Sequence, residues 1–543
     1  MSPIDKHHSS TQQNDFDAVI IGAGFAGMYM LHKLRGQGLR VRVYERGDDV
    51  GGTWYWNRYP GARCDLESMD YSYSFDDDLQ QDWDWREKYG TQPELLKYAR
   101  HVADRFKLRS DIVFKTKIRS AWYNTEAKVW TVTTDQDDTA SAAHLILATG
   151  NLSTPQLPKI NGIESFNGRR LHTGAWPHEP VSFKGRRVGV IGTGSSAIQA
   201  IPVIANQAEH LTVFQRTANF SIPARHGTLS ADDSAAYKAR YNEHRATAKE
   251  TPFGIAKYET PTRSCWDVDD TERQKIYEEA WAEGGQALLF AFTDLLTDPK
   301  ANKTAAKFVR ERIRETVKDP AVAELLCPKD HPIGTKRLCL DSSYYETYNR
   351  GNVRLVGVKN TPISHIEADA VMVGDDRYKI DDLVLATGYD AMTGVARDMD
   401  IVGEEGMSLA DLWAGGPKTY LGLMVANFPN MYMITGPQSP GVKSQMILSI
   451  EHHVELIAAI IEKARTHGNA AVRVEQDAQD GWVEHNNAVA NATLYSEAAS
   501  WYMGSNIPGK AQVFMPYVGG VKRYRAYCDE VINEGWRGLE FSA

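Results

Sequence analysis

The sequence predicts an α/β fold made of two Rossmann-like dinucleotide-binding domains with a helical insertion. The first observation behind this prediction is a glycine-rich turn that occurs twice, each time after a short apolar run. The second is a stretch rich in charge and helix formers that separates the second turn from later short strands. At 543 residues, the chain is long enough for two or three domains rather than one core.

The first turn, Gly22-Ala23-Gly24-Phe25-Ala26-Gly27, follows the apolar run 18–21. Its first two glycines permit a tight turn, and Gly27 keeps the next helix close to the sheet, so a pyrophosphate can lie on the helix N-terminus. The following strand, 41–44, ends in Glu45, whose carboxylate can accept hydrogen bonds from both ribose hydroxyls. This pattern predicts a dinucleotide without a 2′-phosphate, as in FAD.

The second turn, Gly192-Thr193-Gly194-Ser195-Ser196-Ala197, follows the apolar run 188–191. The next strand, 211–214, runs into Gln215-Arg216-Thr217, so an arginine stands where the first copy has an acid. Arg216 can pair with a 2′-phosphate, which predicts NADPH. A single such turn could be a strand-to-helix connection without a ligand. Two copies with opposite charge at the discriminating position argue against that alternative.

Two further apolar strands, 145–150 and 383–388, end in small residues. We interpret them as crossings between a flavin domain and an inserted nucleotide domain, with two unrelated buried strands as the alternative. In the insertion, Ala305, Val309, Ile313 and Val317 form one apolar stripe of a helix expected to lie over the second domain. The expected divisions are a disordered tail at 1–14, an FAD domain at 15–150 and 385–543, an NADPH domain at 151–227 and 330–384, and the insertion at 228–329.

Composition narrows the class of protein. The net charge of −9 argues against nucleic acid or an anionic membrane as a partner, and no apolar run approaches the roughly 20 residues of a membrane helix. The N-terminus lacks the apolar segment of a secretory signal. Five scattered cysteines fit a reducing compartment and show no metal-ligand spacing. We therefore expect a cytoplasmic protein without a metal, monomeric or weakly self-associating.

An aromatic segment with paired glycines lies between the two turns. It reads Gly51-Gly52-Thr53-Trp54-Tyr55-Trp56-Asn57-Arg58-Tyr59-Pro60-Gly61-Ala62-Arg63-Cys64-Asp65. Aromatic rings beside close-packed backbone suit a flat ring system, so we interpret the segment as part of a site. An aromatic core cluster is the alternative.

The segment just before the second turn carries a family resemblance. Phe166, Gly168, His172, Trp176 and Pro177 match, position for position, the fingerprint of Baeyer–Villiger monooxygenases. The resemblance covers about residues 16–540 and is strongest to the phenylacetone, steroid and cyclohexanone monooxygenase branch.

The resemblance implies a reaction. NADPH would reduce FAD, the reduced flavin would react with O₂ to give a C4a-peroxyflavin, and this would convert a ketone substrate to an ester or lactone. Sulfides would be oxidised as well. A flavin monooxygenase that oxygenates nitrogen or sulfur is the enzymatic alternative, and a flavin-binding protein without turnover is an alternative of another class.

The resemblance also implies roles for single residues. Arg337 resembles the catalytic arginine, with Asp65 as the acid that orients it and Lys336 as a partner of Arg216 and Thr217 on the 2′-phosphate. An arginine suits this task because it cannot lose its proton and presents a planar fork of donors. The expected cofactor contacts are Gly22, Gly24, Ala26, Gly27, Glu45, Thr53, Trp54, Tyr55, Trp56, Arg63, Asp65, Tyr71, Gly192, Gly194, Ser195, Ser196, Gln199, Arg216, Thr217, Lys336, Met446 and Trp501.

His172 is expected to be a conformational linker, and a structural histidine is the alternative. The expected substrate pocket contains Asn151, Leu152, Gly441, Val442 and Met446. Lys443, within the segment that resembles the substrate-shaping bulge, departs from the phenylacetone enzyme. It either points to solvent or alters the pocket, and both readings stay open here.

Overall fold

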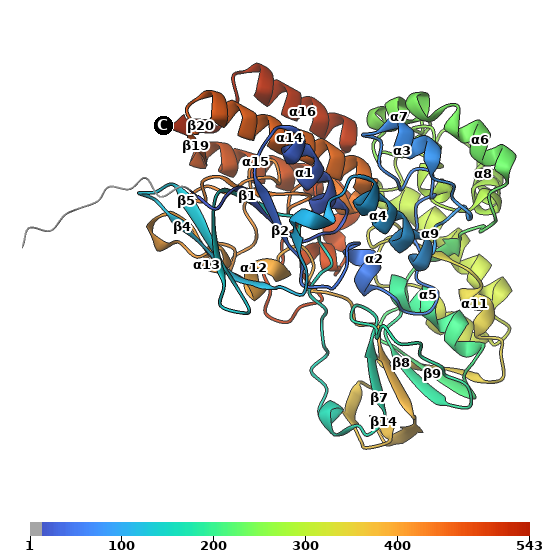
Figure 1. Cartoon of the computed structure of the whole chain (residues 1–543). Coiled ribbons are helices and arrows are strands. Elements are labelled where there is room, and N and C mark those ends of the chain that lie inside the picture. The colour runs from blue at the N-terminus through green and yellow to red at the C-terminus, as the bar shows by residue number, and fades with distance from the viewer. Residues whose placement is uncertain (1–13, 543) are drawn as a thin grey trace, which may run out of the picture.

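The structure is a computed structural model that describes residues 14–542. Two main sheets lie at different ends of the molecule, and helices fill the space beside them (Figure 1). The expected disordered tail at 1–14 lies outside the described residues except for Asn14.

The first main sheet has eight strands, and the first glycine-rich turn follows its strand β1. Strand β1 is apolar and buried over its last four residues, and it pairs in parallel with β2 and β6. Along the sheet the order is β17-β4-β5-β6-β1-β2-β3, with β18 beside β6. The strands are β1 (Phe16–Ile21), β2 (Val41–Tyr44), β3 (Ile112–Val113), β4 (Ile118–Asn124), β5 (Val129–Thr134), β6 (Thr139–Leu147), β17 (Asp400–Val402) and β18 (Met431–Met433).

The second main sheet has five parallel strands in the order β12-β9-β8-β16-β7. Both faces of an all-parallel sheet are normally covered, which explains why β8 and β9 are buried almost throughout. The strands are β7 (Arg169–His172), β8 (Arg187–Ile191), β9 (His210–Gln215), β12 (Val353–Gly357) and β16 (Asp382–Leu385). The predicted strands 188–191 and 211–214 are therefore confirmed.

Three smaller sheets accompany the main ones. They are β10 (Ser221–Pro223) with β11 (Cys339–Asp341), then β13 (Ile363–Ile366), β14 (Ala370–Val373) and β15 (Asp376–Lys379), and finally β19 (Ala471–Val474) with β20 (Leu539–Ser542).

The chain leaves the first sheet after β6 and returns from the second sheet after β16, as the two apolar strands with small ends predict. Each crossing strand lies against a glycine-rich turn. A Cβ on Gly22 would stand 2.6 Å from the Ala148 carbonyl oxygen, and one on Gly192 would stand 2.4 Å from that of Ala386. Both glycines also have positive φ, so each turn requires glycine. The assignment of the two sheets to FAD and NADPH domains, with the boundaries given above, stays a proposal.

Helices cover the first sheet and its neighbours. Helix α1 (Phe25–Gly36) follows the first turn and packs against α14 (Met446–Thr466). The others in this part of the molecule are α2 (Thr53–Trp56), α3 (Asp77–Asp82), α4 (Gln92–Arg105), α12 (Gly394–Asp398), α13 (Leu409–Leu412), α15 (Gln476–Asn491) and α16 (Val521–Asn533). Helices α5 (Ser195–Ala205) and α11 (Tyr344–Thr347) belong to the second turn and its surroundings.

The helical insertion contains α6 (Ala231–Lys238), α7 (Tyr241–Glu250), α8 (Asp270–Glu283), α9 (Pro299–Thr316) and α10 (Pro320–Leu326). The predicted stripe is confirmed, since Ala305, Val309, Ile313 and Val317 are all buried along and just after α9.

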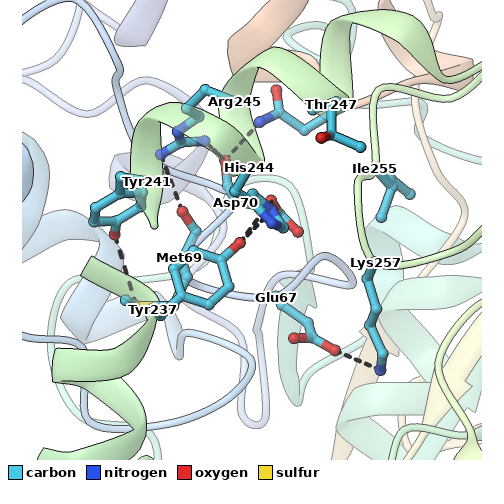
Figure 2. A network of polar contacts seen from close by, with 12 residues as sticks. Glu67, Met69, Asp70, Tyr237, Tyr241, His244, Arg245, Thr247, Ile255 and Lys257 are labelled. Carbon is cyan, nitrogen blue, oxygen red and sulfur yellow. Dashed lines mark hydrogen bonds and ion pairs between the residues drawn. The ribbon is translucent and has the colours of Figure 1, made fainter. Parts of the chain in front are cut away.

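The insertion, which is expected over the second domain, also reaches the first part of the chain through α6 and α7. Both pack against the segment 67–72, which comes from the first part of the chain (Figure 2). Arg245 of α7 donates hydrogen bonds to the carbonyl oxygens of Met69 and Asp70, and the Asp70 carboxylate contacts His244 at 2.5 Å. Hydrophobic periodicity marks which face of a helix is buried but not which partner covers it.

None of the helices within residues 14–542 is long and apolar enough to cross a membrane. The five cysteines are free and buried. Over the same range, no group of three His, Cys, Asp or Glu side chains is arranged to hold a metal ion.

Candidate active site

An arginine–aspartate pair lies where the two main parts of the molecule meet. Arg337 lies two residues before β11, and Asp65 ends the aromatic segment. The Arg337 Nε and Nη2 atoms donate to the two Asp65 carboxylate oxygens at 2.7 and 2.6 Å. Burial alone would lower the pKa of Arg337, but the Asp65 carboxylate outweighs it and raises that pKa, so the guanidinium stays charged. The residues predicted as a catalytic pair are thus in direct contact.

Arg337 also forms part of a pocket wall. Its Nη1 atom donates to the Val442 carbonyl oxygen at 2.8 Å, which ties it to the segment before α14. The empty space between its lining residues is about 500 Å³ when the open solvent at its mouth is included. Most of its other lining is apolar: Leu66, Phe253, Ile255, Leu289, Phe290, Leu338 and Tyr495, with Gln286, Gly334, Lys443 and Ser444.

The first glycine-rich turn fits a dinucleotide. Gly24 is the N-cap residue of α1 and offers no side-chain cap, so the backbone N–H groups of the first turn are available to a pyrophosphate. The Glu45 carboxylate at the end of β2 accepts from the backbone N–H groups of Ala23 and Gly47, each at 2.8 Å. Burial raises the pKa of Glu45, and these two donors act against that rise. A carboxylate has about four acceptor positions, so ribose hydroxyls can still bind here.

The aromatic segment lies beside this turn. Thr53, Trp54, Tyr55 and Trp56 form α2, and the Trp54 indole donates to the Tyr71 hydroxyl at 3.2 Å. Trp56 stacks under the Arg46 guanidinium at 4.4 Å. Trp54 and Tyr55 are buried while Tyr71 is half-buried, so the segment belongs to the hydrophobic core and also forms part of the wall of the candidate site.

The second glycine-rich turn fits a dinucleotide as well. Helix α5 begins at Gly194 without a side-chain cap, and a Cβ on Gly194 would meet no atom within 4 Å, so the space before the helix is open. The Thr193 hydroxyl donates to the Thr217 carbonyl oxygen at 2.8 Å and fixes the turn against the end of β9. Ser195 contacts the Cys339 sulfur at 3.1 Å, so this turn lies next to β11 and Arg337.

Two cations lie together beside this turn. Arg216 is exposed at the end of β9, and Lys336 is half-buried next to Arg337. Burial, followed by the nearby Arg216 charge, lowers the pKa of Lys336. Neither side chain forms an ion pair within the described residues. An unneutralised pair of cations suits a doubly charged 2′-phosphate.

Gln199 of α5 connects the two halves of the site. Its amide donates to the Arg63 carbonyl oxygen at 3.0 Å and accepts from the Tyr59 hydroxyl at 2.8 Å. The helix that follows the second turn is therefore bonded to the segment that carries Asp65. This contact explains how residues from two separate nucleotide folds reach one pocket.

His172, at the end of β7, lies between the two crossing segments. Its Nδ1 atom accepts from the Gly174 N–H at 3.0 Å, and its Nε2 atom is 3.3 Å from both the Gln156 carbonyl oxygen and the Thr387 hydroxyl. Burial lowers the pKa of His172, which keeps the ring neutral. These hydrogen bonds are what a structural histidine would form. They also connect the segment of Gln156 to that of Thr387, and the conformational role of His172 stays a prediction.

The other predicted site residues are more scattered. Trp501 packs against Tyr502 with ring centroids 4.2 Å apart, and Met446 is half-buried at the start of α14. Asn151 lies beside Gly441 but lines a different pocket from Arg337, with Met392 and Thr435. Leu152 is 37% exposed and does not line the Arg337 pocket.

Several pocket residues were missed by sequence reasoning. Phe253, Gln286, Leu289 and Phe290 come from the insertion, and Tyr495 comes from the C-terminal region. No local signal marks them, because apolar residues in a helical region read as ordinary core. Their place in the site depends on the docking of the insertion against the segment 67–72.

Comparisons with known proteins agree with this geometry. A family model described as pyridine nucleotide-disulphide oxidoreductase matches residues 19–251, a range in which Cys64 is the single cysteine. A Baeyer–Villiger monooxygenase of Pseudooceanicola batsensis is 42% identical over 99% of this chain and 98% of its own length.

The chain belongs to the Baeyer–Villiger monooxygenase family.

Other relatives place this monooxygenase within the family. The phenazine N-monooxygenase PhzNO1 of Lysobacter antibioticus is 41% identical over 96% of each chain. An oxidised steroid monooxygenase bound to NADP is 49% identical, with a TM-score of 0.92 over 97% of this chain and 99% of its own. An OTEMO complex with FAD and NADP is 37% identical, with a TM-score of 0.94 over 98% of this chain and 100% of its own. The α/β fold with two Rossmann-like sheets is therefore that of the family.

Proposed function

We propose that this monooxygenase uses NADPH, O₂ and bound FAD to convert ketones to esters or lactones, with Arg337 as the cation at the reacting centre. The observation that carries the proposal is the two-fold hydrogen-bonded Arg337–Asp65 pair on the wall of a largely apolar pocket. Sulfide oxidation is expected as a second activity of the same site.

FAD, when bound, supplies the electron transfer and the activation of O₂. The chain supplies position and charge. Arg337 cannot lose its proton, and Asp65 holds its planar fork in one orientation, so its charge is already in place when negative charge develops on the ketone oxygen. Where the apolar side chains of the lining replace water, this interaction is stronger than in bulk solvent.

The two turns divide the cofactors between them. The Gly22–Gly27 turn and Glu45 would hold FAD, and the Gly192–Ala197 turn would hold NADPH with Arg216 and Lys336 on its 2′-phosphate. The uncapped N-termini of α1 and α5 support this division, because each leaves backbone donors for a pyrophosphate.

Five buried free thiols support a cytoplasmic location, and we propose a monomer or a weak homo-oligomer.

A second candidate function is oxygenation of nitrogen or sulfur. It is favoured by the 41% identity to a phenazine N-monooxygenase over nearly the whole chain. Sulfoxide formation would not separate the two, since Baeyer–Villiger enzymes also oxidise sulfides. Formation of an ester or lactone from a ketone would.

The test is product analysis of the purified holoenzyme with NADPH, air and a panel of phenylacetone, cyclohexanone, a long-chain 2-ketone and a steroid ketone. We expect an ester or lactone one oxygen heavier than its ketone. NADPH consumption with only hydrogen peroxide as product would contradict ketone oxidation, and amines and thioethers would then be tested.

Arg337→Ala separates the chemical step from flavin reduction. We expect NADPH to reduce the flavin at a rate close to that of the native enzyme, while ester formation falls about 100-fold or more because the fixed cation is lost. Stopped-flow absorbance and gas chromatography measure the two quantities. Arg354→Ala, an exposed arginine of β12, is the matched control. Normal ester yield in Arg337→Ala would overturn the role of this residue.

A further inference from the structure

Lys443 lines the same pocket as Arg337 and is the second cation in its wall. It closes the short turn Gly441–Lys443 just before α14 and follows Val442, whose carbonyl oxygen accepts from Arg337. The turn therefore aims the side chain at the pocket rather than at bulk solvent, which decides between the two readings left open by the sequence.

Two aromatic rings enclose the Lys443 ammonium. Its Nζ atom lies 4.3 Å from the centre of the Tyr495 ring and 4.8 Å from that of Tyr502. Ring faces attract a cation, and this attraction offsets part of the cost of removing the ammonium from water. Tyr495 also lines the pocket, so the enclosed ammonium sits at its boundary.

The Lys443 charge has no counter-charge. Within the described residues, its Nζ atom forms no ion pair and no hydrogen bond, and the Asp65 carboxylate is paired with Arg337. The charged or titratable groups that face it are Arg337, Tyr495 and Tyr502. Burial and then the Arg337 charge lower the pKa of Lys443 to about 7. An anion bound beside the ammonium would relieve both effects.

We propose that Lys443 binds a carboxylate of the substrate, so that this monooxygenase prefers ketones bearing a carboxylate group over neutral ketones. The inference rests on the proposed function and names its substrate class. The ketone would lie toward Arg337, the apolar lining would hold the carbon chain, and the carboxylate would meet Lys443. Arg337 is the weaker anion receptor, because its charge is already balanced by Asp65 in a two-fold contact.

The test compares each keto acid from 4-oxopentanoate to 8-oxononanoate with its methyl ester, using holoenzyme and NADPH. We expect at least one acid to have a kcat/KM about tenfold above that of its ester, the order expected for a charged hydrogen bond. Lys443→Met should reduce this ratio about tenfold, mainly through KM for the acid, and Lys443→Arg should retain most of it. Lys522→Met, which removes an exposed lysine, is the matched control and should keep the ratio.

An equal kcat/KM for acid and ester in the native enzyme, or an unchanged ratio in Lys443→Met, would overturn the inference. If no ketone of any kind is oxidised, the proposed function fails, and calorimetric titration with heptanoate tests the carboxylate site separately. Weaker heptanoate binding in Lys443→Met than in the native holoenzyme supports the site, and equal binding overturns it. Lys443→Gln replaces Lys443→Met if the latter does not retain FAD.

Discussion

Each cation of the site is distinguished by whether the protein supplies its counter-charge. Arg337 is fully engaged by Asp65, so it remains a fixed charge whatever enters the pocket. Within the described residues, Arg216 and Lys336 lie together without an ion pair, and the Lys443 ammonium lies between two aromatic rings. A cation held without a counter-charge destabilises the unliganded protein. An anionic ligand stabilises that cation when it binds. The paired arginine thus suits catalysis, and the unpaired cations suit binding.

Arg216→Ala tests the 2′-phosphate site. Because the substitution removes a charged partner of that phosphate, we expect KM for NADPH to rise about tenfold. KM for NADH, which lacks the phosphate, should change much less and serves as the internal control. Steady-state NADPH and NADH oxidation with the same ketone measures both. An equal rise for the two cofactors would contradict the assignment.

Strand pairing places Arg337, the residue that we propose as the catalytic cation. The short strand β11 pairs in parallel with β10, with Ser221 opposite Cys339 and Pro223 opposite Asp341. Because Arg337 lies two residues before Cys339, this register sets its position in the wall. The pair is held at its far end by Asp341, which accepts from the Ser221 hydroxyl and from the Tyr344 backbone N–H. Burial raises the pKa of Asp341 to about 6.

Asp341→Asn tests this buried carboxyl. In the unfolded chain the Asp341 carboxyl group ionises near pH 4, whereas in the folded protein it ionises only at about pH 6. The native protein therefore loses stability as pH rises from 4 to 6, and an asparagine removes that loss. We expect the free energy of unfolding of the variant, relative to that of the native protein, to rise by about 2 kcal/mol from pH 4 to pH 8. Urea unfolding at both values measures it, with the exposed Asp375→Asn as control. A difference that does not change with pH would contradict the buried ionisation.

At the scale of the whole molecule, the insertion is a structural clamp and a pocket wall at once. Helices α6 and α7 hold the segment 67–72, which continues the chain after Asp65 (Figure 2). The residues before and after α8 line the pocket. Arg245 is buried and donates to the Met69 and Asp70 carbonyl oxygens and the Ser72 hydroxyl. The site therefore depends on contacts between three separate stretches of chain.

Arg245→Met should loosen this clamp. The substitution keeps an apolar stem but leaves buried carbonyl oxygens without donors, so we expect a loss of about 3 kcal/mol in the free energy of unfolding. Urea unfolding monitored by tryptophan fluorescence measures it. Arg240→Met removes an exposed arginine that pairs only with Glu243 and should cost less than about 0.5 kcal/mol. Equal effects of the two variants would show that the clamp adds nothing.

The elements that local pattern predicts are those found in the structure. Both glycine-rich turns, the strands around them and the apolar stripe of α9 follow from residues close together in the chain. The Arg337–Asp65 contact was expected from family resemblance, because no local pattern links residues 272 positions apart. The placement of α6 and α7 was missed, since periodicity does not name a partner.

By itself, the sequence determined that two nucleotide turns of opposite charge character exist and that the chain shares the monooxygenase fingerprint. Glycine-rich turns and apolar periodicity involve residues close together in the chain, so they can be recognised without knowledge of the fold. Only the tertiary structure decided that the insertion lines the pocket, that Asn151 and Leu152 do not line it, and that Lys443 faces two tyrosine rings. Such contacts join residues far apart in the chain, and they arise only when the two sheets and the insertion pack together.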